Sequence, residues 1–252
     1  MVTVSTPLGN AQLVRYARQI LLEEVGESGQ ARLLAAKVLV VGAGGLGVPV
    51  ASYLGAAGIG MLGLADSDLV DRTNLPRQVI YSELDIGYSK VQRLEARILD
   101  NNPEVQIMTH PRLTPENASA VIEAYDWIVD GSDNFQTRYL LNAICARQKK
   151  TLISGALSRF TGQLAVFRPG DACYQCLVAR LPNRDATQGC VEGGILGPMA
   201  GLLGCWQALE TLKQILALSS RLQEELLLFD ALNNSSHRIR MRKDQACPVC
   251  GE

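Results

Sequence analysis

The sequence predicts an α/β protein built on a doubly wound, mostly parallel sheet with antiparallel strands added after it. Between residues 37 and 154, short β-branched runs alternate with segments of helical periodicity, which is typical of strands joined by crossover helices. A glycine-rich turn directly follows the first of these strands. After residue 154 the alternation stops, so we expect antiparallel strands in the C-terminal third.

Each element of this fold is predicted from a local pattern. Residues 10–36 are expected to be helical because Leu13, Ala17 and Ile20 recur at helical spacing. In the alternating part we expect strands at 37–41, 61–66, 105–109, 127–130 and 151–154, and helices at 46–57, 88–101 and 134–149. In the last third we expect strands at 162–168, 226–229 and 236–241, and a long apolar helix over 195–218 that Gly197-Pro198 interrupts early.

Composition disfavours several classes of protein. The chain has 24 Lys and Arg against 25 Asp and Glu, a net charge of −1, so its overall charge does not draw it to nucleic acid or anionic lipid. Residues 38–65 form an uncharged run of 28 residues, longer than the ~20 that span a bilayer. Because the run contains eight glycines and Pro49, a buried βαβ unit explains it better. The first ten residues show no secretory signal, and we expect a cytoplasmic protein without a membrane or nucleic-acid partner.

The glycine-rich turn predicts a Rossmann-like nucleotide site. Gly42, Gly44 and Gly47 stand in a G-x-G-x-x-G pattern between a strand and a helix, and Asp66 ends the next strand. Such glycines let the backbone approach phosphate at a helix N-terminus, and the carboxylate suits ribose hydroxyls. The motif indicates an adenine nucleotide without separating NAD, FAD, SAM and ATP. A packing turn with no ligand is the alternative.

The cysteines predict a structural zinc site. Two C-x-x-C knuckles bring together four thiols of the kind that bind zinc in a closed tetrahedron, Cys173, Cys176, Cys247 and Cys250. Disulfides are disfavoured in a cytoplasmic chain. Cys145 and Cys205 lie in apolar helical segments and are expected in the core. Cys190 lies in a polar loop, where a reactive thiol and an inert one fit equally well.

Polar side chains gather where the predicted parallel strands end. Asp66, Asp68, Asn74, Arg77 and Asp133 all follow such ends, where open α/β sheets bind ligands. Each alone fits a solvated charge, and Asp133 with the following Asn134 also fits a helix cap. Together with Gln78, Lys90 and Arg18 they suggest a triphosphate site with Mg²⁺. A histidine-dependent hydrolase is disfavoured, because neither His110 nor His237 lies in a suitable setting.

The order and spacing of these motifs resemble the MoeB/ThiF family over nearly the whole chain. The motifs are RYARQI, GAGGLG, ADSDLVDRTNLPRQ, SKV, DGSDN and the paired C-x-x-C. The family comprises sulfur-carrier adenylyltransferases related to ubiquitin-activating enzymes. The resemblance implies a homodimer that uses ATP and Mg²⁺ to adenylate the C-terminal Gly-Gly carboxylate of a ubiquitin-like (β-grasp) carrier. Pyrophosphate is released, and the carrier is primed for thiocarboxylate formation.

The resemblance also assigns roles to residues. Asp66 would hold the ribose, Asp133 would bind Mg²⁺, and Arg77 and Lys90 would contact the phosphates. Arg18 would reach the triphosphate of the neighbouring subunit. The nucleotide-binding set would be Gly42, Gly44, Gly45, Gly47, Asp66, Asp68, Asn74, Arg77, Gln78, Lys90 and Asp133, and the four knuckle cysteines would hold zinc. In thiamine-type members the cysteine matching Cys190 can form a persulfide-linked acyl intermediate, whereas molybdopterin-type members do not require it.

We expect a single domain over residues 1–252. It would comprise N-terminal helices at 10–36, a nucleotide-binding core at 37–155 and a carrier-binding and zinc part at 156–252. The motifs ADSD and CPVCG look like the thiamine branch, and SGALSRFTGQLAVF and GCVEGGILGP look like the molybdopterin branch. Because the chain ends at Glu252, just after the second knuckle, we expect a separate sulfur donor such as a cysteine desulfurase or a rhodanese.

Three other functions stay open at this point. The glycine motif alone also fits an NAD-dependent oxidoreductase, although that function leaves the basic residues without a role. A relative of the family could adenylate a carboxyl group on a modified tRNA base, which the near-neutral charge disfavours. A non-catalytic partner of another activating enzyme would tolerate loss of Asp133.

Overall fold

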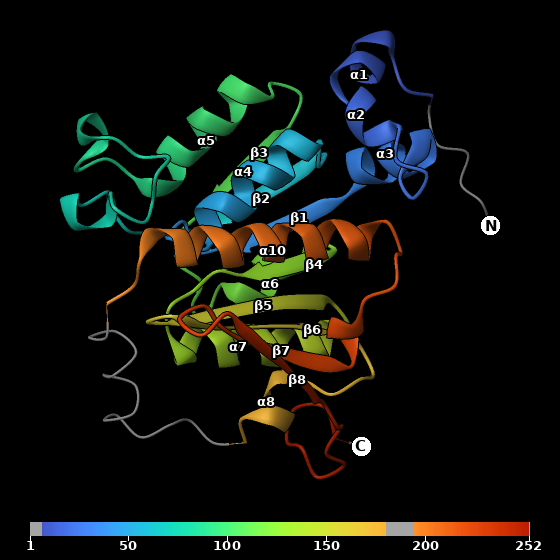
Figure 1. Ribbon diagram of the computed structural model, residues 1–252, viewed down its shortest axis with the longest axis vertical. Helices are drawn as coiled ribbons and strands as arrows, with labels where there is room; N and C mark the ends of the chain where they lie inside the picture. Colours follow the sequence, from blue (N-terminus) through green and yellow to red (C-terminus); the bar gives the residue numbers. More distant parts are fainter. Residues whose placement is uncertain (1–6, 180–193, 252) are drawn as a thin grey trace.

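A single eight-stranded sheet forms the centre of the part of the chain that the computed structural model describes, residues 7–179 and 194–251 (Figure 1). Its strand order is β3-β2-β1-β4-β5-β6-β7-β8. The first five strands in this order are parallel, and the last three are added antiparallel. The strands are β1 Lys37–Val41, β2 Met61–Ala65, β3 Gln106–His110, β4 Trp127–Asp130, β5 Thr151–Ser158, β6 Thr161–Phe167, β7 Glu225–Asp230 and β8 Ser235–Arg240. The predicted fold class is confirmed.

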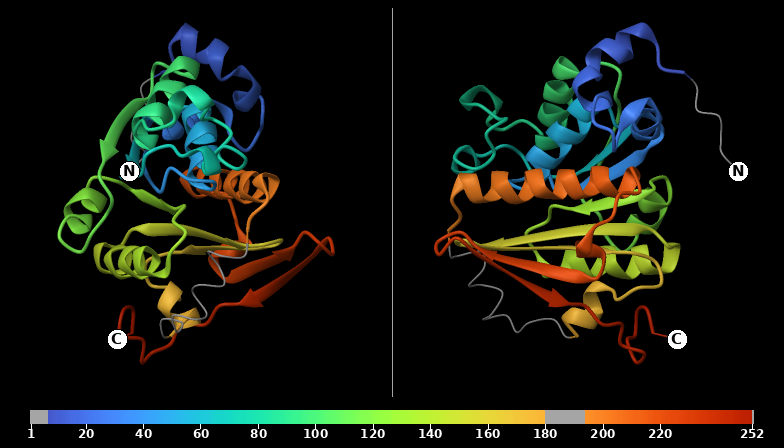
Figure 2. Two further views of the ribbon diagram at one scale, coloured as in Figure 1. Left: turned by 90° about the vertical axis from the view of Figure 1, so that its left-hand side faces the viewer. Right: turned by 45° about the vertical axis from the view of Figure 1, so that its right-hand side comes forward.

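Helices cover both faces of the sheet (Figure 2). One face packs against α3 Gly26–Ala35, α4 Gly47–Ala57, α5 Lys90–Asn101 and α10 Gly197–Ile215. The other packs against α6 Ala118–Glu123, α7 Phe135–Gln148 and α8 Tyr174–Leu177. Short 3-10 turns complete the connections, η1 Arg72–Asn74, η2 Glu83–Asp85 and η3 Arg221–Gln223. Because the inner parallel strands are covered on both faces, they need uninterrupted apolar sequence, and Val38, Leu39 and Val40 of β1 are almost fully buried.

The N-terminal helices are anchored at one end of the sheet. They are α1 Asn10–Arg15 and α2 Ala17–Ile20, followed by α3. Tyr16 between α1 and α2 is buried against Gly58, and its hydroxyl accepts a hydrogen bond from Asn102 Nδ2 at 3.0 Å. Gln19 Nε2 donates to the Ala57 carbonyl at the C-terminal end of α4 (3.2 Å). The glycine-rich turn precedes the N-terminal end of α4, so α2 lies at the opposite end of this helix.

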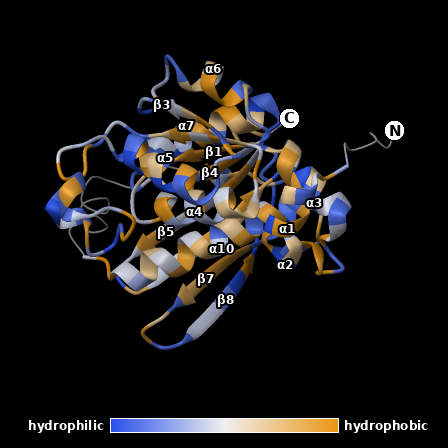
Figure 3. Ribbon diagram, turned by 90° about the horizontal axis from the view of Figure 1, so that it is seen from above, coloured by the Kyte–Doolittle hydropathy of each residue, from blue (hydrophilic) through white to orange (hydrophobic). Residues whose placement is uncertain are grey.

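The antiparallel strands differ in hydropathy. In Figure 3, β7 is mostly hydrophobic, whereas β8 at the edge of the sheet is mostly hydrophilic. All the β8 residues from Ser236 to Arg240 are exposed. Charged side chains on an edge strand oppose unwanted pairing with other strands. Among the helices of the described residues, none combines the length and apolar character that a membrane span requires.

Strand β5 and helix α10 differ from the sequence prediction for reasons that the structure explains. Strand β5 continues to Ser158, beyond the predicted end at residue 154, because its second half pairs with β6 in a hairpin. Gly197-Pro198 does not interrupt the long helix but begins it, with Pro198 in the first turn. Proline suits this place because the first turn of a helix has no use for the missing N–H.

Candidate nucleotide site and cysteine cluster

A cavity of about 770 Å³ lies at the carboxyl ends of the parallel strands. Val41 at the end of β1, Ala65 at the end of β2 and Gly131 after β4 line it. The cavity continues along β5 and across the antiparallel strands as far as His237 on β8. It therefore joins the glycine-rich turn to the added part of the sheet.

The glycine-rich turn is too tight for side chains at two of its positions. Gly42 has a φ of +96°, and a Cβ on it would lie 2.8 Å from the Gly131 carbonyl oxygen. A Cβ on Gly47 would lie 1.6 Å from the Gly42 carbonyl oxygen. Gly42, Gly44 and Gly45 line the cavity, whereas Gly47 is not among the lining residues and allows the turn to close.

Asp66 is held at the cavity by backbone groups. Its carboxylate accepts hydrogen bonds from Ala43 N at 2.7 Å and from Asp68 N at 2.8 Å. A carboxylate offers about four acceptor positions. Two accepted bonds thus leave capacity for a ligand hydroxyl.

Lys90 begins α5 and is paired with Asp68. Its Nζ lies 3.0 Å from Asp68 Oδ2, with exposed side-chain fractions of 7% and 50% for lysine and aspartate. Arg112 also reaches Asp68, at 3.3 Å. Phosphate entering the cavity would meet two cations that one carboxylate already holds.

Tyr81 lies beneath this cluster. Its buried hydroxyl is 2.9 Å from the Ala43 carbonyl oxygen and 3.2 Å from that of Lys90. Burial raises the pKa of Tyr81 well above its usual value, and Asp66 raises the pKa further. The hydroxyl therefore stays protonated and ties the glycine-rich turn to the start of α5.

The segment after β2 supplies three more lining residues, Asn74, Arg77 and Gln78. Arg77 Nη1 donates to the Thr73 carbonyl at 2.9 Å, and Asn74 Oδ1 accepts from Asp71 N at 3.2 Å. Gln78 is buried, and its Oε1 has no hydrogen-bond partner among the described residues. A buried acceptor without a partner is costly, so this oxygen is a candidate to meet a ligand donor.

Asp133 stands in the turn between β4 and α7 and is exposed in the cavity lining. The residue that caps α7 is Asn134, whose Oδ1 accepts from Thr137 N at 2.8 Å. Asp133 is thus not needed as the cap. Its carboxylate is available to a cation.

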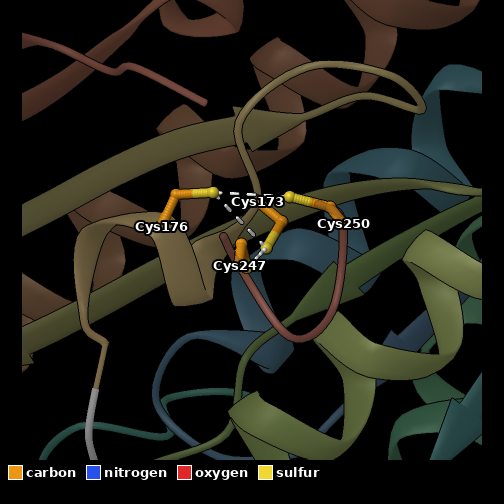
Figure 4. A group of neighbouring side chains, drawn as sticks. All are labelled: Cys173, Cys176, Cys247 and Cys250. Atoms are coloured by element: carbon orange, nitrogen blue, oxygen red, sulfur yellow. Dashed lines mark hydrogen bonds between the residues drawn. The ribbon is translucent and has the colours of Figure 1, made fainter. Parts of the chain in front are cut away.

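The two C-x-x-C knuckles meet in space (Figure 4). The four sulfurs all lie within 4.8 Å of one another, with 3.7 Å between Cys173 and Cys247 and 3.3 Å between Cys176 and Cys250. Zinc bound to four thiolates at about 2.3 Å places neighbouring sulfurs about 3.8 Å apart. The cluster therefore fits a tetrahedral zinc ion.

Neighbouring groups also suit a metal–thiolate site. Asn142 Nδ2 on α7 lies 3.5 Å from Cys173 Sγ, and Asp244 N lies 3.4 Å from Cys176 Sγ. Donors of this kind orient metal ligands. Cys145 is a core residue as expected, and burial raises the pKa of its thiol to about 12. Cys205 on α10 is only partly buried, and Cys190 lies outside the described residues.

One predicted site residue is remote from the cavity. Arg18 is exposed on α2 and is not among the lining residues. Sequence reasoning also missed lining residues, namely Arg112, Arg138, Gln163 and His237. Arg112 follows β3, so the strand-end rule that found the other residues also applies to it.

Comparison with known families matches residues 16–249 to the ThiF family. The chain belongs to this family. It is 44% identical to the sulfur carrier protein adenylyltransferase of Thermus thermophilus, with 96% of this chain and 92% of the relative aligned. It is also 44% identical to the adenylyltransferase and sulfurtransferase MOCS3 of Anopheles gambiae, over 98% of this chain. This ThiF-family chain spans 57% of the length of that relative.

The fold of the chain resembles a solved ThiF-like structure. The crystal structure of E. coli MccB with ATP superposes with a TM-score of 0.80 at 25% identity. The alignment covers 94% of this chain and 75% of MccB.

Proposed function

We propose that this ThiF-family chain uses ATP and Mg²⁺ to adenylate the C-terminal Gly-Gly carboxylate of a ubiquitin-like sulfur carrier. The observation that carries the proposal is the continuity of the cavity from the glycine-rich turn to β8. One continuous space can hold a nucleotide at one end and an extended polypeptide tail at the other. A relative named as a sulfur carrier protein adenylyltransferase, aligned over almost its whole length, supports it.

The nucleotide end has the groups that ATP requires. The turn offers backbone N–H groups at the N-terminus of α4, where a helix favours phosphate. Asp66 would accept ribose hydroxyls, and Arg77 and Lys90 would contact phosphate oxygens. Asn74 and Gln78 would support them. An NAD-dependent oxidoreductase would leave these cations without a role.

The other end of the cavity suits an extended tail with small side chains. Ala156, Ser158, Thr161 and Gln163 line it from the hairpin of β5 and β6. Gly162 between them has no room for a side chain, since a Cβ would lie 2.2 Å from the Phe229 ring. Small and polar lining residues leave space for backbone, which is what a Gly-Gly segment presents.

The reaction needs positioning more than a base. A terminal carboxyl group has a pKa of about 3.5, so it is already ionised near neutral pH. One of its oxygens attacks the α-phosphorus, the bond to the β-phosphate breaks, and pyrophosphate leaves with the bonding electrons. Arg77 and Lys90 neutralise charge that spreads over the phosphates. Mg²⁺ held by Asp133 would supply further charge neutralisation for the leaving group.

The knuckle cysteines would hold zinc in a structural role. The ion would pin the end of the chain to the segment that follows β6. We further propose that sulfur comes from a separate donor, a cysteine desulfurase or a rhodanese.

The direct test is ATP–pyrophosphate exchange with each Gly-Gly-ending carrier of the source organism offered separately. We expect exchange with one carrier, and it would stop when the terminal glycine is removed, because the attacking carboxylate is then displaced. If folded and zinc-loaded protein shows no ATP–pyrophosphate exchange with any carrier, the proposal is contradicted. That result would favour a non-protein carboxylate such as a modified tRNA base.

We also propose a homodimer in which Arg18 completes the partner's site. In its own chain Arg18 lies on α2, at the far end of α4 from the glycine-rich turn. Tyr53, Leu202 and Leu209 are each more than half exposed on the outer faces of α4 and α10. Exposed apolar side chains on neighbouring helices suit an interface.

A mixed dimer tests this arrangement. Arg18→Ala and Asp133→Ala homodimers should both be inactive. In each heterodimer, one of the two sites combines an intact Asp133 with the partner's intact Arg18. About half of randomly mixed dimers are heterodimers, so mixing should restore about a quarter of wild-type exchange. Tandem purification on two different tags would isolate the heterodimer for the assay. A heterodimer without activity would contradict action of Arg18 in the partner's site.

A further inference from the structure

A buried ion pair lies directly beneath the turn that carries Asp133. Asp130, the last residue of β4, is fully buried, and Arg138 in the first turns of α7 is 4% exposed. Arg138 Nε lies 3.0 Å from Asp130 Oδ2. Replacing a buried ion pair with apolar residues is often neutral or stabilising, so fold stability alone is a weak reason for one.

The pair holds every polar group of Ser132, the residue before Asp133. Ser132 N and Oγ donate to Asp130 Oδ1 at 3.0 Å and 2.6 Å. The Ser132 carbonyl oxygen accepts from Arg138 Nη2 at 3.2 Å. The backbone next to the proposed magnesium ligand is therefore bonded on both sides to the two charges.

The pair is itself held from both faces of the sheet. Ser154 Oγ on β5 donates to Asp130 Oδ2 at 3.0 Å, and Gln207 Nε2 on α10 donates to the Asp130 carbonyl at 2.8 Å. Helices α10 and α7 lie on opposite sides of these strands (Figure 1). The carboxylate and the guanidinium therefore have little freedom to move. Ser132, which is hydrogen-bonded to both, is held in place with them.

We propose that the Asp130–Arg138 pair is a positioning device that fixes Ser132 and so holds the Asp133 carboxylate where it can bind the metal ion of bound nucleotide. This inference rests on the proposed function, in which Asp133 is the magnesium ligand. Groups that orient a metal ligand typically change metal affinity about 10- to 100-fold when they are lost. The pair is neutral as a unit, so its effect comes from geometry and not from added charge.

The test measures metal-dependent nucleotide binding without turnover. Calorimetry would give the affinity for AMPCPP, an ATP analogue that cannot transfer its adenylyl group, with Mg²⁺ and without any added divalent cation. Asp130→Asn/Arg138→Gln removes both charges and leaves none buried alone. In this double variant, the gain in AMPCPP affinity on adding Mg²⁺ should be smaller by a factor on the order of ten. This loss should exceed any change in the metal-free affinity.

A control ion pair and a combination of substitutions distinguish a positioning role of the Asp130–Arg138 pair from a purely structural role. Glu210→Gln/Lys213→Gln removes another ion pair (2.7 Å) on α10, in which Glu210 is buried and Lys213 is partly exposed. This pair lies outside the cavity lining, so the variant should leave the Mg²⁺ gain intact. The triple variant, in which Asp133→Asn is added to the Asp130/Arg138 variant, should gain as much AMPCPP affinity from Mg²⁺ as Asp133→Asn alone. This is expected because the pair acts through Asp133. If the double variant fails to fold, Arg138→Lys keeps the charge but loses the fork that joins Asp130 to Ser132, and should show the same loss.

Two outcomes would overturn the inference. A folded double variant with the full Mg²⁺ gain and only a lower melting temperature would make the pair purely structural, and the proposed function would be unaffected. If Mg²⁺ does not raise the AMPCPP affinity of the wild type, Asp133 has no role as a metal ligand. That result would contradict both the positioning role of the pair and the Mg²⁺-dependent function proposed above.

Discussion

Asp133→Asn should fold like the wild type but lose at least about a hundredfold of its pyrophosphate exchange, the scale of losing one well-placed electrostatic group. The amide keeps the shape of the side chain and removes the charge that would hold Mg²⁺. The fold should survive because α7 is capped by Asn134 and the preceding Ser132 is held by Asp130 and Arg138. Initial exchange rates at saturating ATP and carrier, together with a thermal melt, check both statements.

Asp126→Asn is the matched control. Asp126 is exposed just before the other end of β4, outside the cavity lining. This variant should exchange at the wild-type rate. Near wild-type exchange by Asp133→Asn at saturating Mg²⁺ would contradict the proposed role of Asp133 as the magnesium ligand.

The inner parallel strands were predictable because they are buried on both faces. Strands β1 and β4 have the predicted bounds, and β3 is displaced by one residue. Such strands appear in sequence as short apolar runs between turn signals. The end of β5 was not predictable in this way. The hairpin after it turns at Arg159, a non-glycine residue with a φ of +54°, so the usual glycine or asparagine signal is missing.

The short helices were also outside the reach of periodicity. Helix α6 has six residues and α8 has four, fewer than two turns each. An apolar stripe cannot repeat in so short a segment. These helices form because the chain packs there against α7.

The gathering of polar residues at the end of the cavity near the glycine-rich turn was predictable for a topological reason. Asp66 and Arg77 follow β2 and Asp133 follows β4, far along the chain, but the carboxyl ends of parallel strands meet at one edge of the sheet. The end of the cavity near β8 was not predictable from the sequence. The register of an antiparallel strand decides which of its side chains face the cavity. His237, for example, is opposite Leu228 only in the observed pairing.

Arg138 illustrates a different limit. In sequence it is one charge on a helix with other polar residues, which is typical of a solvated face. Its burial follows from Asp130, which also ends a strand and could equally have been a cavity residue. Only the three-dimensional contacts show that the two charges meet and which backbone groups they hold.

Loss of the proposed zinc ion should have the largest effect on stability. Replacing Cys176 and Cys250 with serine removes two of the four ligands, and structural zinc sites contribute folding free energy directly. Asp244 N would also lose the Cys176 sulfur that it faces at 3.4 Å. We expect a loss of about 3 kcal/mol in the free energy of unfolding and a melting temperature lower by roughly 10 °C. Metal analysis should give one zinc per wild-type chain and none in the variant.

Cys205→Ser controls for the loss of a thiol. Cys205 is a partly buried cysteine on α10 outside the cluster, so this variant should keep its zinc and its melting temperature. A chelator that strips zinc from the wild type should lower its melting temperature to that of the cysteine variant and have no effect on the variant itself. If the melting temperature of the wild type does not change when zinc is removed, the metal at the cysteine cluster does not stabilise the fold.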